Sequence, residues 1–174
     1  MKTTQVVVIG LGRFGTTVAT TLYQMGHDVL AIDKNSNKVQ ELAGQVTYAV
    51  AADATDEDAL RELGIEKFEY AVVAIGSNTE ASIMVSVLLK SLGISNVVAR
   101  SVSKLQGQTL DWIKVDKVVY PETEMGTKLA HDLFLPGIEQ YMELTSTYGI
   151  SKIKVPPRLV NQSLKNSGFG NQLV

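Results

Sequence analysis

Short apolar runs alternate with amphipathic stretches along the first 134 residues of the chain. The runs are four to six residues long and rich in Val, Ile and Ala, which is typical of buried strands in a parallel sheet. They predict strands over 5–9, 29–32, 46–51, 70–75, 96–99 and 117–120. Helical spacing of apolar residues predicts helices over 16–25, 36–43, 53–63, 79–92, 104–113 and 122–134. Thr55 is the predicted N-cap of the third helix.

Six consecutive strand-helix units predict an α/β fold for residues 1–135. We expect a Rossmann-like, doubly wound sheet of six parallel strands with helices on both faces.

The pattern changes after this domain, where Pro136 and Gly137 interrupt the chain. Residues 136–149 are predicted to be a linker, with a short amphipathic helix or crossover over 138–144. Residues 150–155 alternate apolar and polar side chains, which predicts a half-exposed antiparallel strand. Because a strand without a sheet is marginal, we expect this tail to pair with another copy or to be poorly ordered. Residues 150–174, with a helix starting over 159–164, would open an incomplete second lobe.

The first predicted turn holds a glycine motif, Gly10-Leu11-Gly12-Arg13-Phe14-Gly15. Together with its strand and helix, this motif is the dinucleotide-binding fingerprint. Gly10 allows the tight turn, Gly12 lets a phosphate approach the backbone, and Gly15 lets the helix pack close to the strand. The free N–H groups and the positive dipole end of that helix would face the phosphates.

An acidic residue, Asp33, ends the second strand 18 residues after Gly15. A carboxylate there accepts hydrogen bonds from ribose hydroxyls and would repel a 2′-phosphate. NAD(H), ATP or ADP therefore fit better than NADP(H), although the cation of Lys34 weakens that exclusion. The alternative is that Asp33 merely caps the helix that starts near Asn35.

Composition excludes several classes of protein. The 174 residues have room for one full doubly wound domain and little more, and their net charge of −2 gives no whole-chain attraction to nucleic acid. The lack of cysteine excludes disulfides, thiolate metal sites and a Cys nucleophile. No signal peptide is visible, and the most apolar helix, around 83–92, is too short and polar to span a bilayer. We therefore expect a cytoplasmic protein that does not insert into the membrane.

The other strand ends carry candidate ligand contacts. Asp53 could accept a hydrogen bond from an adenine amino group, or could serve only as a turn or cap residue. Ala74, Ile75 and Gly76 follow the fourth strand, and the small residues among them leave room for adenine or ribose. Arg100 could pair with phosphate oxygens or simply be solvated. Glu122 could hold a divalent cation against phosphates, or could be a favourable charge at a helix N-terminus.

Arg13 stands inside the glycine motif, where a guanidinium lies beside the expected phosphates. It could bind a third phosphate in its own subunit or reach a nucleotide in a neighbour. The alternative is an arginine that faces solvent.

Five separated segments, spread over residues 4–145, resemble RCK (KTN) domains, the regulatory subunits of Ktr/Trk potassium uptake systems. They are 9–15, 33–35, 53–56, 74–78 and 120–126. The resemblance implies a non-enzymatic, cytoplasmic ring built from homodimers, which binds ATP, ADP or NAD(H) and gates a membrane potassium-translocating subunit. Arg13 and Glu122 would lie near the dimer interface and contact phosphates and a cation, Mg²⁺ or Ca²⁺. Residues 148–164 resemble the start of the family's C-terminal ligand-binding lobe.

The motif positions give the full set of expected nucleotide-binding residues. They are Gly10, Leu11, Gly12, Arg13, Phe14, Gly15, Asp33, Lys34, Asn35, Asp53, Ala54, Ala74, Ile75, Gly76, Arg100 and Glu122.

The alternative class is an NAD-dependent oxidoreductase, which needs a general acid or base beside the nicotinamide. His27 lies in a turn remote from the strand tips, and His131 lies late in the last predicted helix. Tyr148 and Lys152 have the spacing of the Tyr-x-x-x-Lys pair of short-chain reductases, but that pair needs a helix. Gly149 and the alternation of apolar and polar residues after it predict a strand instead. The interpretation as an oxidoreductase is therefore the weaker one.

Overall fold

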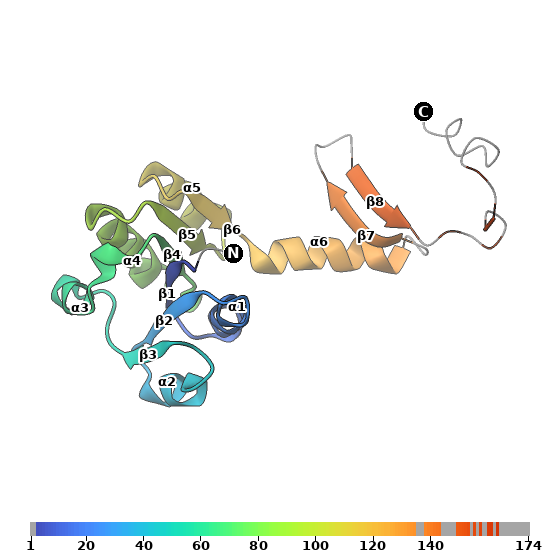
Figure 1. The fold of residues 1–174 in the computed structure, drawn as a ribbon. Helices are drawn as coiled ribbons and strands as arrows, with labels where there is room; N and C mark the ends of the chain where they lie inside the picture. Colours follow the sequence, from blue (N-terminus) through green and yellow to red (C-terminus); the bar gives the residue numbers. More distant parts are fainter. Residues whose placement is uncertain are drawn as a thin grey trace. The chain divides into compact units, whose positions relative to one another are not determined.

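The computed structural model describes residues 3–134, 138–143 and 149–153, together with positions 155, 157, 160, 161 and 163. The chain forms two compact units, Met1–Glu122 and Thr123–Val174. Figure 1 shows the ribbon, and each unit is described by itself below.

The first unit contains a six-stranded sheet in which every paired strand is parallel. The strands lie in the order β3-β2-β1-β4-β5-β6, so the chain reverses direction across the sheet between β1 and β4. This order is the doubly wound Rossmann topology, and ligands bind such sheets at the point of reversal. The strands are β1 (Gln5–Ile9), β2 (Asp28–Asp33), β3 (Tyr48–Ala51), β4 (Tyr70–Val73), β5 (Asn96–Arg100) and β6 (Lys117–Val119).

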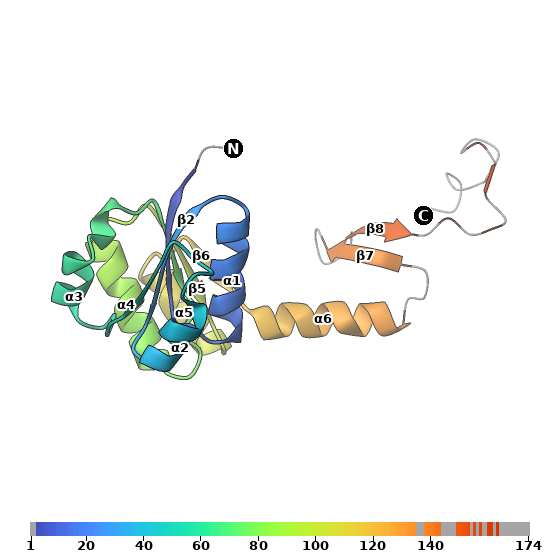
Figure 2. The ribbon, with the colours of Figure 1, turned by 60° about the horizontal axis from the view of Figure 1, so that its bottom comes forward.

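Helices cover both faces of this sheet, as the sequence predicts. Alternate residues of β1 supply two separate cores: Val6 and Val8 enter one, and Val7 and Ile9 enter the other. Figure 2 shows α1 and α4 on opposite sides of the strands. The helices of this unit are α1 (Arg13–Gln24), α2 (Ser36–Leu42), α3 (Glu57–Glu62), α4 (Thr79–Ser91) and α5 (Lys104–Trp112), with a 3₁₀ turn, η1, at Ile65–Lys67. Helix α6 (Pro121–Phe134) begins at the end of this unit and belongs mostly to the second.

Two helix starts differ from the expectation. Helix α1 begins at Arg13, within the glycine motif, because Gly12 already takes the N-cap position. Helix α3 is capped by Asp56, whose side chain accepts the N–H of Asp58 at 3.0 Å. The prediction that Thr55 caps this helix is therefore wrong. The Thr55 hydroxyl donates instead to Asp53 at 2.7 Å, so it is not available for the helix end.

The second unit contains an antiparallel hairpin of β7 (Ile138–Glu143) and β8 (Gly149–Ile153). The predicted strand over 150–155 is thus confirmed in its main part, but its partner is β7 of the same chain rather than another copy. The helix or crossover expected over 138–144 is wrong, because 138–143 pairs as a strand. Short apolar-polar stretches of this kind are ambiguous in period, and a nearby strand decides the outcome. Half of the helix start expected over 159–164 falls outside the described residues, which include 160, 161 and 163.

The boundaries 1–135, 136–149 and 150–174 stay predictions. Within the part of the chain that the structure describes, no helix has both the length and the apolar character needed to cross a bilayer.

Candidate functional site

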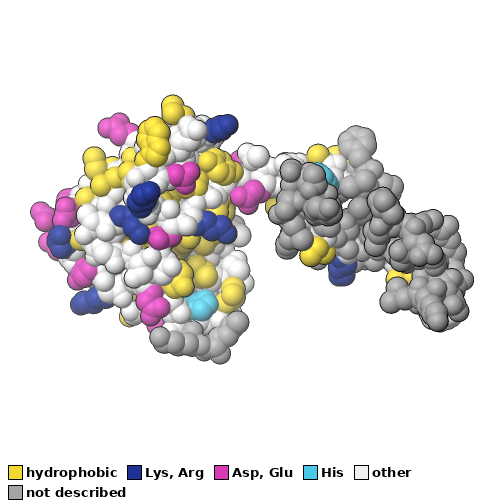
Figure 3. Space-filling model, turned by 90° about the horizontal axis from the view of Figure 1, so that it is seen from above, with side chains coloured by type: hydrophobic (Ala, Val, Ile, Leu, Met, Phe, Trp, Pro, Cys, Tyr) yellow, Lys and Arg dark blue, Asp and Glu magenta, His cyan; other side chains and the backbone are white. Residues whose placement is uncertain are grey.

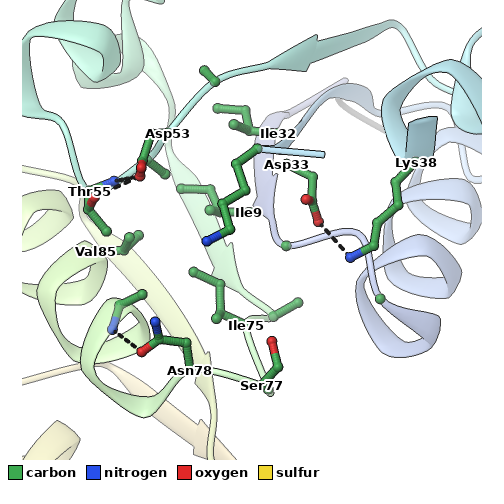
Figure 4. Close-up of a pocket in the computed structure, with 18 of the residues that line it drawn as sticks. Ile9, Ile32, Asp33, Lys38, Asp53, Thr55, Ile75, Ser77, Asn78 and Val85 are labelled. Carbon is green, nitrogen blue, oxygen red and sulfur yellow. Dashed lines mark hydrogen bonds and ion pairs between the residues drawn. The ribbon is translucent and has the colours of Figure 1, made fainter. Parts of the chain in front are cut away.

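A cavity of about 470 Å³ opens at the carboxyl ends of strands β1 to β5. This volume lies within the roughly 300–1,000 Å³ typical of small-molecule sites, and Figure 4 shows residues from several strand ends converging on it. The cavity lies at the reversal of strand order, where the fold predicts a ligand. Its lining residues are Ile9, Gly10, Gly12, Ile32, Asp33, Lys34, Lys38, Ala52, Asp53, Ala54, Thr55, Ala74, Ile75, Gly76, Ser77, Asn78, Ala81, Val85 and Arg100.

The glycine turn between β1 and α1 is built as its spacing predicts. Gly10 has φ +97°, a conformation that favours glycine, and a Cβ there would lie 2.9 Å from the backbone nitrogen of Ile75. A Cβ at Gly15 would overlap the carbonyl oxygen of Gly10, so the helix packs directly on the turn. Gly12 faces open space and gives α1 no side-chain cap. The first N–H groups of α1 are therefore placed to bind an anion.

Asp33 lies opposite this turn at the end of β2. Its Oδ2 accepts the backbone N–H of Leu11 at 2.7 Å, and its Oδ1 accepts the N–H of Asn35 at 2.9 Å. Burial alone would raise the pKa of Asp33, but these two hydrogen bonds and the Lys38 ammonium outweigh it, and the pKa is lowered. The carboxylate is thus charged and held in place by the backbone.

The helix after β2 is capped by Asn35, whose side chain accepts the N–H of Asn37 at 3.0 Å. The alternative in which Asp33 is only the cap of this helix is therefore wrong. Asn35 itself does not line the cavity, whereas Lys34 does. Lys38, which the sequence analysis missed, lines the cavity and forms an ion pair with Asp33 Oδ2 at 3.2 Å.

Asp53 lies after β3, on the wall of the cavity that also includes Ala54. Its Oδ1 accepts both the N–H of Thr55 at 3.0 Å and the Thr55 hydroxyl at 2.7 Å. The two bonds from Thr55 lower the pKa of Asp53, the small effect of burial opposes them, and the charge of Lys34 lowers it further. Oδ2 accepts no hydrogen bond from the residues that the structure describes, so one carboxylate oxygen can accept a hydrogen bond from a ligand.

Ala74, Ile75 and Gly76 follow β4 and form the centre of the cavity wall. A Cβ at Gly76 would overlap the Arg100 guanidinium, so that side chain lies directly over the glycine. Arg100 also forms a short ion pair with Glu122 at the start of α6. Its Nε is buried and has no hydrogen-bond partner among the residues that the structure describes. The guanidinium therefore retains donor capacity next to the cavity.

Glu122 lies outside the cavity lining, beside two arginines. Its own backbone N–H, as expected at a helix start, is the main cause that lowers its pKa. Burial opposes this slightly, and Arg100 and then Arg13 lower the pKa further. Arg13, which also lies outside the lining, is therefore close enough to act on Glu122. Among the described residues, no three His, Asp or Glu side chains form a metal-binding group.

The cavity brings together most of the expected residues. Gly10, Gly12, Asp33, Lys34, Asp53, Ala54, Ala74, Ile75, Gly76 and Arg100 line it, while Leu11, Arg13, Phe14, Gly15, Asn35 and Glu122 do not. Three of the residues outside the lining support residues that belong to it: the Leu11 N–H donates to Asp33, Gly15 packs against the turn, and Glu122 pairs with Arg100. Ligand contacts for all of them stay predictions. Apart from Lys38, the polar lining residues missing from the expected set are Thr55, Ser77 and Asn78.

The glycine turn, the carboxylate at the end of β2 and the strand order define a Rossmann-type nucleotide-binding domain. A family model described as the TrkA-N domain matches residues 6–121. The chain belongs to this family, that of the RCK-type regulatory subunits of Ktr/Trk potassium uptake systems.

Two relatives support this assignment. The chain is 40% identical to Ktr system potassium uptake protein A of Bacillus subtilis over 164 residues, and this match covers 94% of this chain and 74% of that protein. It is 33% identical over 162 residues to Ktr system potassium uptake protein A of Vibrio alginolyticus, covering 93% and 74%.

Solved structures share the fold at low sequence identity. The TrkA-N domain of the inner membrane protein ybaL from Escherichia coli has a TM-score of 0.68 at 17% identity, covering 76% of this chain and 98% of that one. GsuK bound to ADP has a TM-score of 0.61 at 16% identity, covering 72% and 33%. The GsuK channel bound to NAD has a TM-score of 0.60 at 17% identity, covering 71% and 22%.

Proposed function

We propose that this chain is a cytoplasmic regulatory subunit that binds ATP, ADP or NAD(H) and gates a membrane potassium transporter. The observation that carries the proposal is the Asp33 carboxylate, held by the Leu11 N–H opposite an uncapped glycine turn. The names of the relatives support the transporter, and the ADP and NAD bound to proteins of the same fold support the ligand class.

The geometry suits an adenine nucleotide laid across the strand ends. The ribose would bind Asp33, and the phosphates would bind the N–H groups at the start of α1. The adenine would lie between Asp53 and the small residues after β4. There the free carboxylate oxygen of Asp53 can accept a hydrogen bond from the adenine amino group. The second half of NAD(H) would extend toward Ser77 and Asn78, which line the other side of the cavity.

The sensing end of the site is formed by Arg13, Arg100 and Glu122. A third phosphate would offer both arginines charge-assisted hydrogen bonds, and Arg100 would exchange Glu122 for phosphate oxygens. The released Glu122 would then bind Mg²⁺ or Ca²⁺. Because the described residues form no acidic cluster there, the remaining metal ligands would be phosphate oxygens and water. Homodimers that assemble into a ring would carry this change to the transporter.

The experiment that tests this proposal compares ATP with ADP. A ligand shifts an assembly only through its differential affinity for two states. We expect ATP with Mg²⁺ to change the dimer geometry seen by small-angle scattering, and ADP not to produce the same state. Arg13→Ala should erase the difference and leave adenosine binding largely intact, whereas the control Arg61→Ala should keep it. Identical scattering of the wild-type protein with both nucleotides would contradict the switching role.

Catalysis is not part of the proposed function. Asp33, Lys34, Lys38, Asp53 and Arg100 are the ionisable residues of the cavity lining. Asp33 and Lys38 are paired with each other, and Asp53 is bound by Thr55. A dehydrogenase would need a proton donor or acceptor beside the nicotinamide. We expect no turnover of NAD(H) with simple alcohols or hydroxy acids above the uncatalysed rate. Turnover that is lost in Gly12→Ala would restore the oxidoreductase alternative.

The surface charge of the first unit does not favour nucleic acid as a partner. On the face in Figure 3, acidic and basic side chains of the first unit are interspersed. Without a basic surplus, the phosphate backbone offers no strong attraction. We therefore place the protein at the inner face of the cell membrane, held there by the transporter rather than by direct membrane insertion.

A further inference from the structure

The acceptor positions of Asp33 are almost filled. A carboxylate has about four acceptor positions on its two oxygens. Leu11 N–H and the Lys38 ammonium take those of Oδ2, and Asn35 N–H takes one on Oδ1. The two N–H groups are fixed by the backbone, so Lys38 is the one of these three donors that can leave. Its side chain is 43% exposed, which lets it move into solvent or toward a ligand.

The substituent at the ribose 2′ position therefore meets Lys38 as well as Asp33. A free 2′-hydroxyl donates to the carboxylate and competes with the ammonium for Oδ2. A 2′-phosphate carries only acceptors at neutral pH, and Asp33 alone would repel it. The ammonium has three N–H donors and uses one of them on Asp33, so it can also bind a phosphate oxygen.

The charges around Asp33 balance and so do not oppose this arrangement. Lys38 extends from α2 to the Asp33 carboxylate at the edge of the cavity (Figure 4). Lys34 lines the same cavity and adds a second ammonium. With Asp33 these two lysines give a local charge of +1. Asp53 adds one negative charge on the adjoining wall, and Arg100 is held by Glu122 at the end of β5.

We propose that Lys38 sets what the cavity accepts at the ribose 2′ position, and that it admits NADP(H) in addition to nucleotides with a free diol. The proposal rests on the proposed nucleotide function and extends its ligand class. Lys38 is a specificity-determining residue here, because it would contact the 2′-phosphate and leave the adenine and the other phosphates to the rest of the site.

The test measures calorimetric affinities for NADH, NADPH and ATP on the full chain. We expect the wild-type protein to bind NADPH within about tenfold of NADH. Lys38→Met should weaken NADPH about tenfold or more, the size of one charge-assisted hydrogen bond, and should lower NADPH affinity more than it changes the affinities for NADH and ATP. Lys38→Arg should keep NADPH binding. The matched control is Lys90→Met, which removes a similar Lys–Asp pair, to Asp116 at 2.9 Å, outside the cavity lining.

Each other outcome has a definite meaning. If the wild-type protein binds NADH but not NADPH, this inference is wrong and the nucleotide function stands. If Lys38→Met weakens NADH and NADPH equally, Lys38 supports the site in general and does not read the 2′ position. If none of the three ligands binds, the proposed function fails together with the inference.

Discussion

Asp33, which lines the cavity, and Glu122, which lies outside the lining, are two carboxylates held in different ways. The Asp33 side chain is 9% exposed and accepts two backbone N–H groups and a lysine. The Glu122 side chain is 65% exposed and pairs with the guanidinium of Arg100. Backbone donors cannot change partner without refolding the turn, whereas two paired side chains such as Glu122 and Arg100 can. The end of β2, with Asp33, is therefore suited to fixed recognition of a nucleotide, and we call it the fixed end of the site. The start of α6, with Glu122 and its partner Arg100, is suited to a response that depends on which nucleotide is bound, and we call it the exchangeable end.

The most damaging change to the fixed end is Gly15→Ala. The added Cβ would overlap the Gly10 carbonyl oxygen, which belongs to the backbone and cannot turn aside. Overpacking typically costs about 1–3 kcal/mol, and we expect the upper end or more. Because the turn also presents Leu11 N–H to Asp33, nucleotide binding should be lost as well.

Thermal unfolding and calorimetry measure the two effects of this change. Gly12→Ala is the matched control: its Cβ would have open space, so the midpoint of unfolding should shift little. If Gly15→Ala unfolds at the same temperature as Gly12→Ala, the close packing of α1 on the turn does not support the fixed end.

The next largest effect is expected from Asp33→Ala. Loss of the proposed ribose acceptor should weaken ATP, ADP and NADH by roughly 1.5–3 kcal/mol, the size of a hydrogen bond to a charged group. Asp116→Ala is the control, since Asp116 also accepts a backbone N–H, from Val97 at 2.7 Å, and pairs with a lysine. Calorimetry should show normal affinities for Asp116→Ala, which lies outside the cavity lining. Unchanged affinities of Asp33→Ala for all three ligands would show that Asp33 does not bind the ribose.

The fixed end of the site is also the part that sequence predicts best. Its signals are local: an apolar strand, three glycines at set spacing and an acid at the next strand end. Lys38 was missed because a lysine in the first turn of a surface helix looks like any solvated charge. The signal that could have found it is its position three residues after the cap Asn35, which directs it back toward the end of β2.

The exchangeable end was predicted only as separate residues. Arg100 and Glu122 were each assigned to a ligand, but the structure pairs them with each other. The pairing arises because β5 and β6 are neighbours, with Arg100 in register with Val119. The hairpin of β7 and β8 was missed for a related reason: a strand over 138–143 becomes the better choice only once its partner over 149–153 is known.

The smallest expected effect is a difference in how the stability contributed by Asp33 and by Glu122 depends on pH. The pKa of Asp33 is lowered in the folded protein, so its contribution to stability is present above the unfolded value of about 3.9 and is lost as pH falls through the folded value. The destabilisation caused by Asp33→Asn should therefore be constant from pH 5 to 8 and shrink below pH 4. The pKa of Glu122 is lowered in the same direction, but solvent screens this exposed group.

Glu122→Gln should accordingly leave the unfolding midpoint close to that of the wild-type protein at every pH. Its control is Glu57→Gln, which removes another exposed carboxylate in the first turn of a helix, one that pairs with Arg61 in the last turn of the same helix at 2.6 Å. Both variants should unfold alike, because exposed ion pairs contribute little. They should differ in one measurement, the dependence of ATP affinity on Mg²⁺, which Glu122→Gln should reduce and Glu57→Gln should keep. If Glu122→Gln instead destabilises the fold as much as Asp33→Asn and keeps the Mg²⁺ dependence, Glu122 is a structural residue, and the contrast between a fixed and an exchangeable end does not hold.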